Sequence, residues 1–197
     1  AFRECESLPL AEGQVRVKSL FAAAKHGTEM SLFKGYAGPR GGFDTALRLF
    51  DNKGGEINFP VALGNMGVGE VIELGPGVSQ LKEGDRVFHY GPFREEHVWP
   101  ETARVLPDGV PWQAAVCLDP ADFALGAVRD GHVRIGDAVA IFGLGAISLI
   151  ALQLCRLAGA HPIIALDPLE NRRQAALQCG ADLALDADDA AWQRVAD

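Results

Sequence analysis

The chain has 197 residues, a mass of 21.0 kDa and 48% hydrophobic residues, so it can bury a substantial core and does not have a disordered composition. Its 18 basic and 26 acidic residues give a formal net charge of -8, which argues against a nucleic-acid or anionic-membrane partner because both require a basic face. The cysteines have neither metal-site spacing nor the density of a disulfide scaffold, which favours a reducing, cytoplasmic location (Cys5, Cys117, Cys155 and Cys179).

Up to about residue 110 the sequence predicts a β domain. Short apolar stretches are separated by Gly and Pro, as at 14–19, 68–74 and 86–88. A Lys-Glu-Gly-Asp turn at 82–85 separates the last two of these stretches. The first part of the chain is therefore expected to be antiparallel sheet.

From about residue 119 the pattern changes to alternating strands and helices. The predicted order is a helix ending at Gly131, then strand 138–142, helix 146–157, strand 162–166, helix 169–178, strand 183–185 and a last helix opened by 187–191. Glycines interrupt the uncharged run 138–155, so we do not interpret it as a membrane span. The predicted fold class is α/β plus β, with domains at 1–118 and 119–197, the second being the first half of a doubly wound parallel sheet.

The strongest motif is a glycine-rich turn between a predicted strand and a predicted helix. Its residues are Gly143, Leu144, Gly145, Ala146, Ile147 and Ser148. The first glycine permits the turn, the second allows a pyrophosphate to approach the backbone, and the helix N-terminus attracts the anion. Ser148 replaces the usual third Gly or Ala. We predict a dinucleotide site here, while an ordinary strand–helix turn remains the alternative.

An acidic residue follows the second predicted strand. Asp167 stands 24 positions after Gly143, where a carboxylate accepts hydrogen bonds from the adenosine ribose and repels a 2′-phosphate. This favours NAD as the cofactor. Arg172 and Arg173 follow closely and leave NADP open.

Three segments together resemble the medium-chain dehydrogenase/reductase superfamily: 69–87, Val105-Leu-Pro-Asp-Gly109 and the Gly143 turn. The most similar members are the zinc-containing alcohol, threonine and polyol dehydrogenases. The resemblance implies a GroES-like β domain, a Rossmann domain and a small-molecule substrate in the cleft between them. Family members are longer and commonly dimeric or tetrameric, so we expect a fragment or split product of a homo-oligomer.

The resemblance also shows that the zinc ligands are altered. His26, in His-Gly-Thr-Glu, stands where the family has Cys, and Gly64-Asn65-Met66 replaces a Gly-His-Glu motif. Asp119 stands where polyol dehydrogenases have a Glu, which leaves only two plausible donors, whereas zinc sites need at least three protein ligands. The four-cysteine lobe of the structural zinc is also missing. We therefore expect no catalytic zinc.

Without zinc, another group must stabilise the reacting oxygen. Our hypothesis is that His26, oriented by Asp119, donates the proton or stabilises the oxyanion, and that Thr28, which matches the family's relay hydroxyl, passes the proton onward. The alternative is that His26 is a buried, satisfied histidine. His89, His97 and Trp99 lie in a stretch that approaches the substrate cleft in this family, but a structural role is favoured. The aromatics in and beside the loop 34–55 could cap a pocket (Phe33, Tyr36, Phe43 and Phe50).

The predicted function is an NAD(P)-dependent oxidoreductase that transfers hydride between the cofactor and an alcohol/ketone pair, without catalytic zinc. One alternative is a zinc-independent C=C reductase of the quinone or enoyl type. Another is a non-catalytic dinucleotide-binding protein. Assays with carbonyl and enone substrates separate these three.

Overall fold

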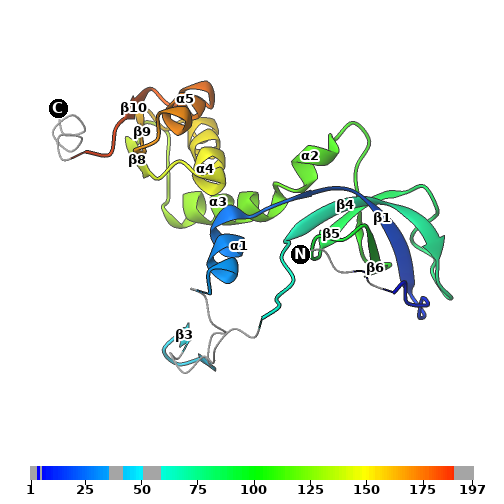
Figure 1. Cartoon of the computed structure of the whole chain (residues 1–197). Helices are drawn as coiled ribbons and strands as arrows, with labels where there is room; N and C mark the ends of the chain where they lie inside the picture. Colours follow the sequence, from blue (N-terminus) through cyan, green and yellow to red (C-terminus); the bar gives the residue numbers. More distant parts are fainter. Residues whose placement is uncertain (1–3, 5, 36–41, 51–58, 189–197) are drawn as a thin grey trace. The chain divides into compact units, whose positions relative to one another are not determined.

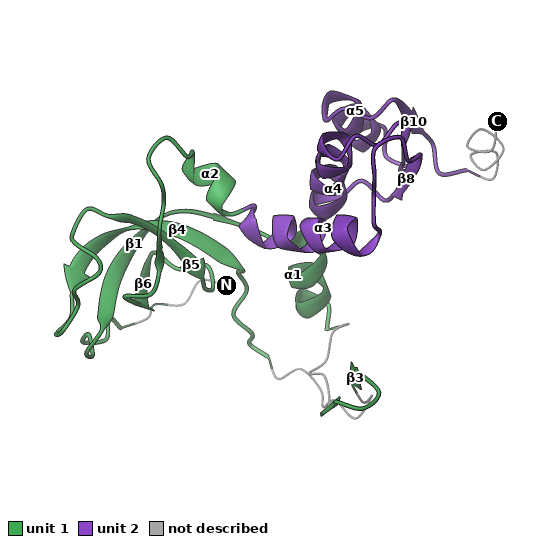
Figure 2. Cartoon of the chain, turned by 180° about the vertical axis from the view of Figure 1, so that it is seen from behind, with its two compact units in different colours: residues 1–116 green, residues 117–197 purple. Residues whose placement is uncertain are grey.

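The structure is a computed structural model that describes residues 4, 6–35, 42–50 and 59–188. The chain divides into two compact units, residues 1–116 and 117–197 (Figure 2). The division falls just before the first helix of the second unit, whereas the sequence pattern placed the boundary after residue 118.

Unit 1 is built on a five-stranded antiparallel sheet in the order β6-β1-β4-β5-β7. The strands are β1 (Gln14–Ala23), β4 (Met66–Leu74), β5 (Arg86–Tyr90), β6 (Glu96–Pro100) and β7 (Arg104–Val105). β1 pairs with both β4 and β6, and its register with β4 shifts twice, which bends the strand. The sheet is strongly curved (Figure 1).

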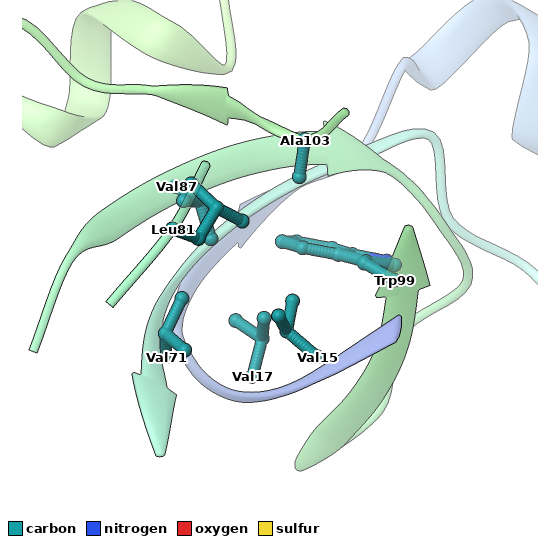
Figure 3. Packing of buried hydrophobic residues seen from close by; sticks show 7 residues of the cluster. All are labelled: Val15, Val17, Val71, Leu81, Val87, Trp99 and Ala103. Carbon is teal, nitrogen blue, oxygen red and sulfur yellow. The ribbon is translucent and has the colours of Figure 1, made fainter. Parts of the chain in front are cut away.

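The core of unit 1 follows from the period-two pattern of its strands. Val15 and Val17 are fully buried while their neighbours are more exposed, as expected where alternate side chains face one side of a sheet. Valines from neighbouring strands and the Trp99 indole converge with them (Figure 3). The full cluster is Val15, Val17, Val71, Leu81, Val87, Trp99 and Ala103.

Unit 1 also contains helices, the first of which lies within the region expected to be all β. They are α1 (His26–Phe33) and the short α2 (Trp112–Ala115). The sequence did not predict α1 because its residues have no apolar stripe at helical spacing, and its one buried residue is an acid. A short hairpin pairs β2 (Phe43–Asp44) with β3 (Leu49–Phe50).

The predicted aromatic cap lies partly outside the described residues, since Tyr36 and 51–58 are not described. The rings of Phe43 and Phe50 contact each other with centroids 5.0 Å apart, and both side chains are exposed. A role in capping a pocket stays a prediction.

Unit 2 confirms the predicted βαβαβ order. The elements are α3 (Leu118–Asp130), β8 (Val139–Phe142), α4 (Ala146–Leu157), β9 (Ile163–Leu166), α5 (Glu170–Gln178) and β10 (Leu183–Leu185). The three strands are parallel in the order β10-β9-β8. The final predicted helix lies largely outside the described residues. No described helix is long and apolar enough to cross a membrane.

Helices α4 and α5 pack side by side along this small sheet (Figure 1). Leu152 and Cys155 of α4 meet Ile163 and Ala165 of β9 in the core. In parallel sheets the carboxyl ends of the strands share one edge, so the residues after β8 and β9 are brought together there.

Candidate functional site

The glycine-rich turn forms at the carboxyl end of β8. Gly143 follows the strand with φ of 76°, a left-handed conformation that disfavours any residue with a side chain. Gly145 is extended and caps α4 without a side-chain hydrogen bond. The Leu149 N–H donates to the Gly145 carbonyl, which begins the helical ladder. The N–H groups in the first turn of α4 therefore have no acceptor within the helix.

The outer side of this turn is open. A Cβ placed on Gly143 or Gly145 would meet no heavy atom within 4 Å. Ala146 and Ile147 are exposed at the start of α4. An anion at this point would meet unpaired N–H groups and the positive end of the helix dipole. The turn therefore fits the pyrophosphate of a dinucleotide.

Leu144 was predicted as part of the same cofactor site, but its side chain lies in the core of unit 2. Its side chain is 1% exposed and belongs to the core of unit 2. Its N–H donates to Asp167 Oδ2 at 2.8 Å. The buried side chain of Leu144 and its backbone hydrogen bond to Asp167 thus stabilise the conformation of the turn.

Asp167 connects the ends of two strands. Besides the Leu144 N–H, its carboxylate accepts the Leu169 N–H at 2.8 Å on Oδ1, and the residue is 1% exposed. Burial alone would raise the pKa of Asp167, but the two N–H groups and the Arg172 guanidinium outweigh it and hold the pKa below its ordinary value. The residue is a buried anion that braces the turn, and its contact with a ribose stays a prediction.

Two arginines follow Asp167 and differ in exposure. Arg172 Nη1 lies 3.3 Å from Asp167 Oδ2, and its side chain is 40% exposed. Arg173 is mostly buried, donates to the Asp167 carbonyl at 2.7 Å and pairs with Glu170 and Asp186. Arg172 is therefore the arginine that faces solvent beside the predicted ribose position. Arg172 is also the arginine that we predict to bind the cofactor, and this role stays a prediction.

The proposed catalytic residues fall in both units. His26 and Thr28 lie in the first turn of α1, and both are exposed, so the alternative of a buried, satisfied His26 is wrong. Asp119 lies in the first turn of α3 in unit 2 and is buried. Whether Asp119 orients His26 stays a prediction.

Sequence reasoning missed Glu29, on the same turn as His26 and Thr28. Glu29 is 5% exposed, and neither of its carboxylate oxygens has a hydrogen-bond partner among the described residues. Burial raises its pKa, and the backbone N–H groups of Lys25 and Gly64 offset part of this rise without reaching hydrogen-bonding geometry. The only available signal was an acid three positions after His26.

The segment that replaces the family's Gly-His-Glu motif does not fit a zinc site. Met66 is 3% exposed within β4, where it pairs with Ala23 and Tyr90, and the Asn65 carbonyl accepts the Gly91 N–H. Within the described part of the chain, no three His, Cys, Asp or Glu residues are grouped so that they could hold a metal ion. Asn65 and Met66 therefore do not replace the zinc ligand of the family's motif.

His97 and Trp99 belong to the interior of unit 1. The rings stack with centroids 4.6 Å apart, and His97 is 6% exposed. Burial, with smaller contributions from Arg94 and His89, lowers the pKa of His97. This arrangement supports the structural role favoured from the sequence.

Comparison with known proteins identifies the class. Residues 11–104 match the family of the alcohol dehydrogenase GroES-like domain. A putative zinc-binding dehydrogenase from Clostridium scindens superimposes with a TM-score of 0.73 at 21% identity, covering 98% of this chain and 60% of that one. Escherichia coli quinone oxidoreductase complexed with NADPH gives 0.71 at 20% identity, covering 97% and 56%. The fold is therefore a GroES-like β domain followed by part of a Rossmann domain, as predicted.

The chain is similar to members of the medium-chain dehydrogenase/reductase superfamily. Within it, the chain is similar to D-guloside 3-dehydrogenase of Escherichia coli (strain K12), with 39% identity over 196 residues, covering 94% of this chain and 56% of that protein. It is also 31% identical over 150 residues to (R,R)-butanediol dehydrogenase of Bacillus subtilis, covering 62% and 43%. The chain thus spans about half the length of these relatives.

Proposed function

We propose that the chain is part of an NAD(P)-dependent oxidoreductase that transfers hydride between the cofactor and an alcohol/ketone pair, without catalytic zinc. The observation that carries this proposal is the Gly143 turn: an open backbone cradle at the N-terminus of α4, braced by Asp167. The names of the relatives specify a guloside and a butanediol as substrates, which supports a substrate with several hydroxyl groups.

Different residues of unit 2 would bind different parts of the cofactor. The N–H groups at Gly145, Ala146 and Ile147 would hold the pyrophosphate. Asp167 and Arg172 stand beside the expected adenosine ribose, where Asp167 favours NAD and the exposed guanidinium of Arg172 accommodates NADP. When bound, a nicotinamide dinucleotide supplies the hydride chemistry.

Residues of unit 1 would transfer the proton of the substrate hydroxyl. His26 is exposed at the start of α1, where its imidazole can take the proton from a substrate hydroxyl or return it to the carbonyl oxygen. Thr28, exposed on the same turn, can pass that proton to water through its hydroxyl. Asp119 would orient the imidazole. We also propose that the complete protein is a homo-oligomer, which light scattering would test.

Gly145→Ala tests the cofactor site with little effect on the fold. Its φ of -82° suits any residue, and the added methyl meets no protein atom. Only a bound pyrophosphate would be displaced. We expect NADH and NADPH affinity, measured by calorimetric titration at fixed salt, to fall by roughly 10-fold or more, with the unfolding temperature nearly unchanged.

Gly126→Ala in α3 is the matched control, because its added methyl also meets no protein atom. It should leave cofactor affinity unchanged. Wild-type affinity in Gly145→Ala would contradict binding at this turn, and an absence of any dinucleotide binding by the wild type would favour the non-catalytic alternative.

A zinc-independent C=C reductase is the second candidate, because the segment at Asn65 and Met66 offers no zinc site. Turnover of polyols and ketones supports the first function, whereas turnover restricted to quinones or enones supports the second.

A further inference from the structure

The carboxylate of Asp167 is already bonded to donors of the protein itself. Oδ2 accepts the Leu144 N–H at 2.8 Å and lies 3.3 Å from Arg172 Nη1. Oδ1 accepts the Leu169 N–H at 2.8 Å, and the Asp167 side chain is 2% exposed. A ribose bound by this residue would have to bring its hydroxyl groups within hydrogen-bonding distance of the same two oxygens. In this structure the carboxylate does not face a ligand.

The three donors differ in whether a ligand could displace them. The N–H groups of Leu144 and Leu169 belong to the backbone, the first in the glycine-rich turn and the second at the N-cap of α5. The third donor is the Arg172 side chain, which is 40% exposed. Arg172 is therefore the group that a cofactor would have to move before its ribose could reach Asp167.

The exposed part of Arg172 is suited to binding an anion. A guanidinium carries five N–H donors in a planar fork, and Nη1 is the nitrogen that lies against Asp167. Among the described residues, the guanidinium of Arg172 has no second acceptor. A phosphate monoester is the kind of ligand that accepts two parallel N–H bonds from such a fork.

The neighbouring arginine is not free for the same task. The Arg173 side chain is 14% exposed, donates to the Asp167 carbonyl at 2.7 Å and pairs with Glu170 and Asp186. Arg173 therefore balances the acidic side chains around the end of β9. Arg172 keeps donors for a ligand.

We propose that Arg172 covers the Asp167 carboxylate and binds the 2′-phosphate of the cofactor, so that the chain prefers NADP(H) and Asp167 serves as a brace of the glycine-rich turn. This deepens the proposed function, which names both cofactors, and rests on it for the position of the adenosine ribose. An acid after this strand favours NAD only where its oxygens can meet the ribose hydroxyls. The proposal reverses the order of preference that the sequence predicts.

The first experiment compares two cofactors and two fragments on the full chain. Calorimetric titration at fixed salt uses NADPH, NADH, adenosine 2′,5′-bisphosphate and adenosine 5′-monophosphate. We expect NADPH to bind roughly 10-fold or more tightly than NADH, because the guanidinium makes charge-assisted hydrogen bonds to the 2′-phosphate. The bisphosphate should exceed the monophosphate for the same reason. NADH binding as tight as that of NADPH, or tighter, would overturn the proposal.

The second experiment removes the covering side chain. In Arg172→Ala, NADPH affinity should fall roughly 10-fold or more. NADH affinity should rise by roughly two- to fivefold, because the ribose no longer has to displace a partly exposed ion pair. Unchanged NADPH affinity would overturn the phosphate contact, and unchanged or lower NADH affinity would overturn the covering role. Arg129→Ala, which removes an exposed arginine of α3, should change neither affinity.

Gly145→Ala shows whether selection occurs at Arg172 or at the glycine-rich turn. The pyrophosphate is common to both cofactors, so this change should weaken NADPH and NADH by the same factor. A changed ratio of the two affinities in Gly145→Ala would assign the selection to the turn and contradict the role of Arg172.

The two proposals fail in different ways. If the wild type prefers NADPH through Arg172 but turns over no alcohol or ketone, the oxidoreductase proposal fails and the selection by Arg172 stands. If the wild type turns over an alcohol or ketone and Arg172→Ala leaves both cofactor affinities unchanged, the selection by Arg172 fails alone.

Discussion

Asp167 and Glu29 are two buried carboxyl groups with opposite surroundings. Asp167 receives two backbone N–H groups and the Arg172 guanidinium, and its pKa is lowered. Glu29 has no hydrogen-bond partner among the described residues, and its pKa is raised. Compared with an ordinary carboxyl group, the surroundings thus shift Asp167 toward its ionised form and Glu29 toward its protonated form.

The difference shows how each region is built. The Gly143 turn is organised before any ligand arrives, because Asp167 ties together the ends of β8 and β9. The first turn of α1 instead contains a buried carboxyl group without a hydrogen-bond partner among the described residues, which lowers stability. We expect substitutions of the two acids to change stability in opposite directions.

The largest effect is expected for Asp167→Ala. The change leaves the N–H groups of Leu144 and Leu169 buried without an acceptor, which should lower the free energy of unfolding of unit 2 by roughly 2–4 kcal/mol. Urea unfolding followed by circular dichroism measures this loss. Because the folded pKa is lowered, the stability from Asp167 is present above the ordinary carboxyl pKa and is lost as pH falls through the folded value. A loss below about 0.5 kcal/mol would show that Asp167 does not brace the turn.

A smaller effect of opposite sign is expected for Glu29→Gln. Because the folded pKa of Glu29 is raised, the wild type is least penalised below the ordinary carboxyl pKa and loses stability as pH rises through the folded value. Glu29→Gln should therefore unfold at higher temperature than the wild type at pH 8 and at a similar temperature at pH 4.5. Scanning calorimetry at both pH values measures this, and a variant less stable than the wild type at pH 8 would contradict it.

The smallest effect is expected for Arg172→Ala. Its partly exposed ion pair with Asp167 should contribute less than about 1 kcal/mol to stability. The variant should bind NADPH more weakly relative to NADH, because the guanidinium beside the ribose attracts a 2′-phosphate. Arg129→Ala, which changes an arginine in the last turn of α3, is the control. An unchanged ratio of NADPH to NADH affinity would show that Arg172 does not influence which cofactor is preferred.

The element order and the glycine-rich turn of unit 2 could be predicted from the sequence, because the residues that indicate them lie close together in the chain. Gly143 and Gly145 fall in one short turn, and the strand and helix on either side define its context. Even there, the exposure of Arg172 and the burial of Arg173 depend on how α5 lies along the sheet, which spacing does not reveal.

Unit 1 was harder to predict for a physical reason. Helix α1 has no apolar period, so its residues gave no helical signal. Glu29 is buried, and Gly64, whose backbone N–H lies near its carboxyl group, is far away in sequence. Long-range contacts of this kind leave no pattern in a single sequence.

The placement of Trp99 has an optical consequence. Its indole lies inside the curved sheet (Figure 3) and stacks against the His97 ring. Trp112, in the same unit, makes an edge contact with Phe21. Trp192, in unit 2, lies outside the described residues. In a Trp192→Phe background, indole emission would come from unit 1 alone, whereas the emission of bound NADH would report on the turn in unit 2. The indole and NADH emission signals, recorded on one sample, would then show which unit responds first to urea, acid or ligand.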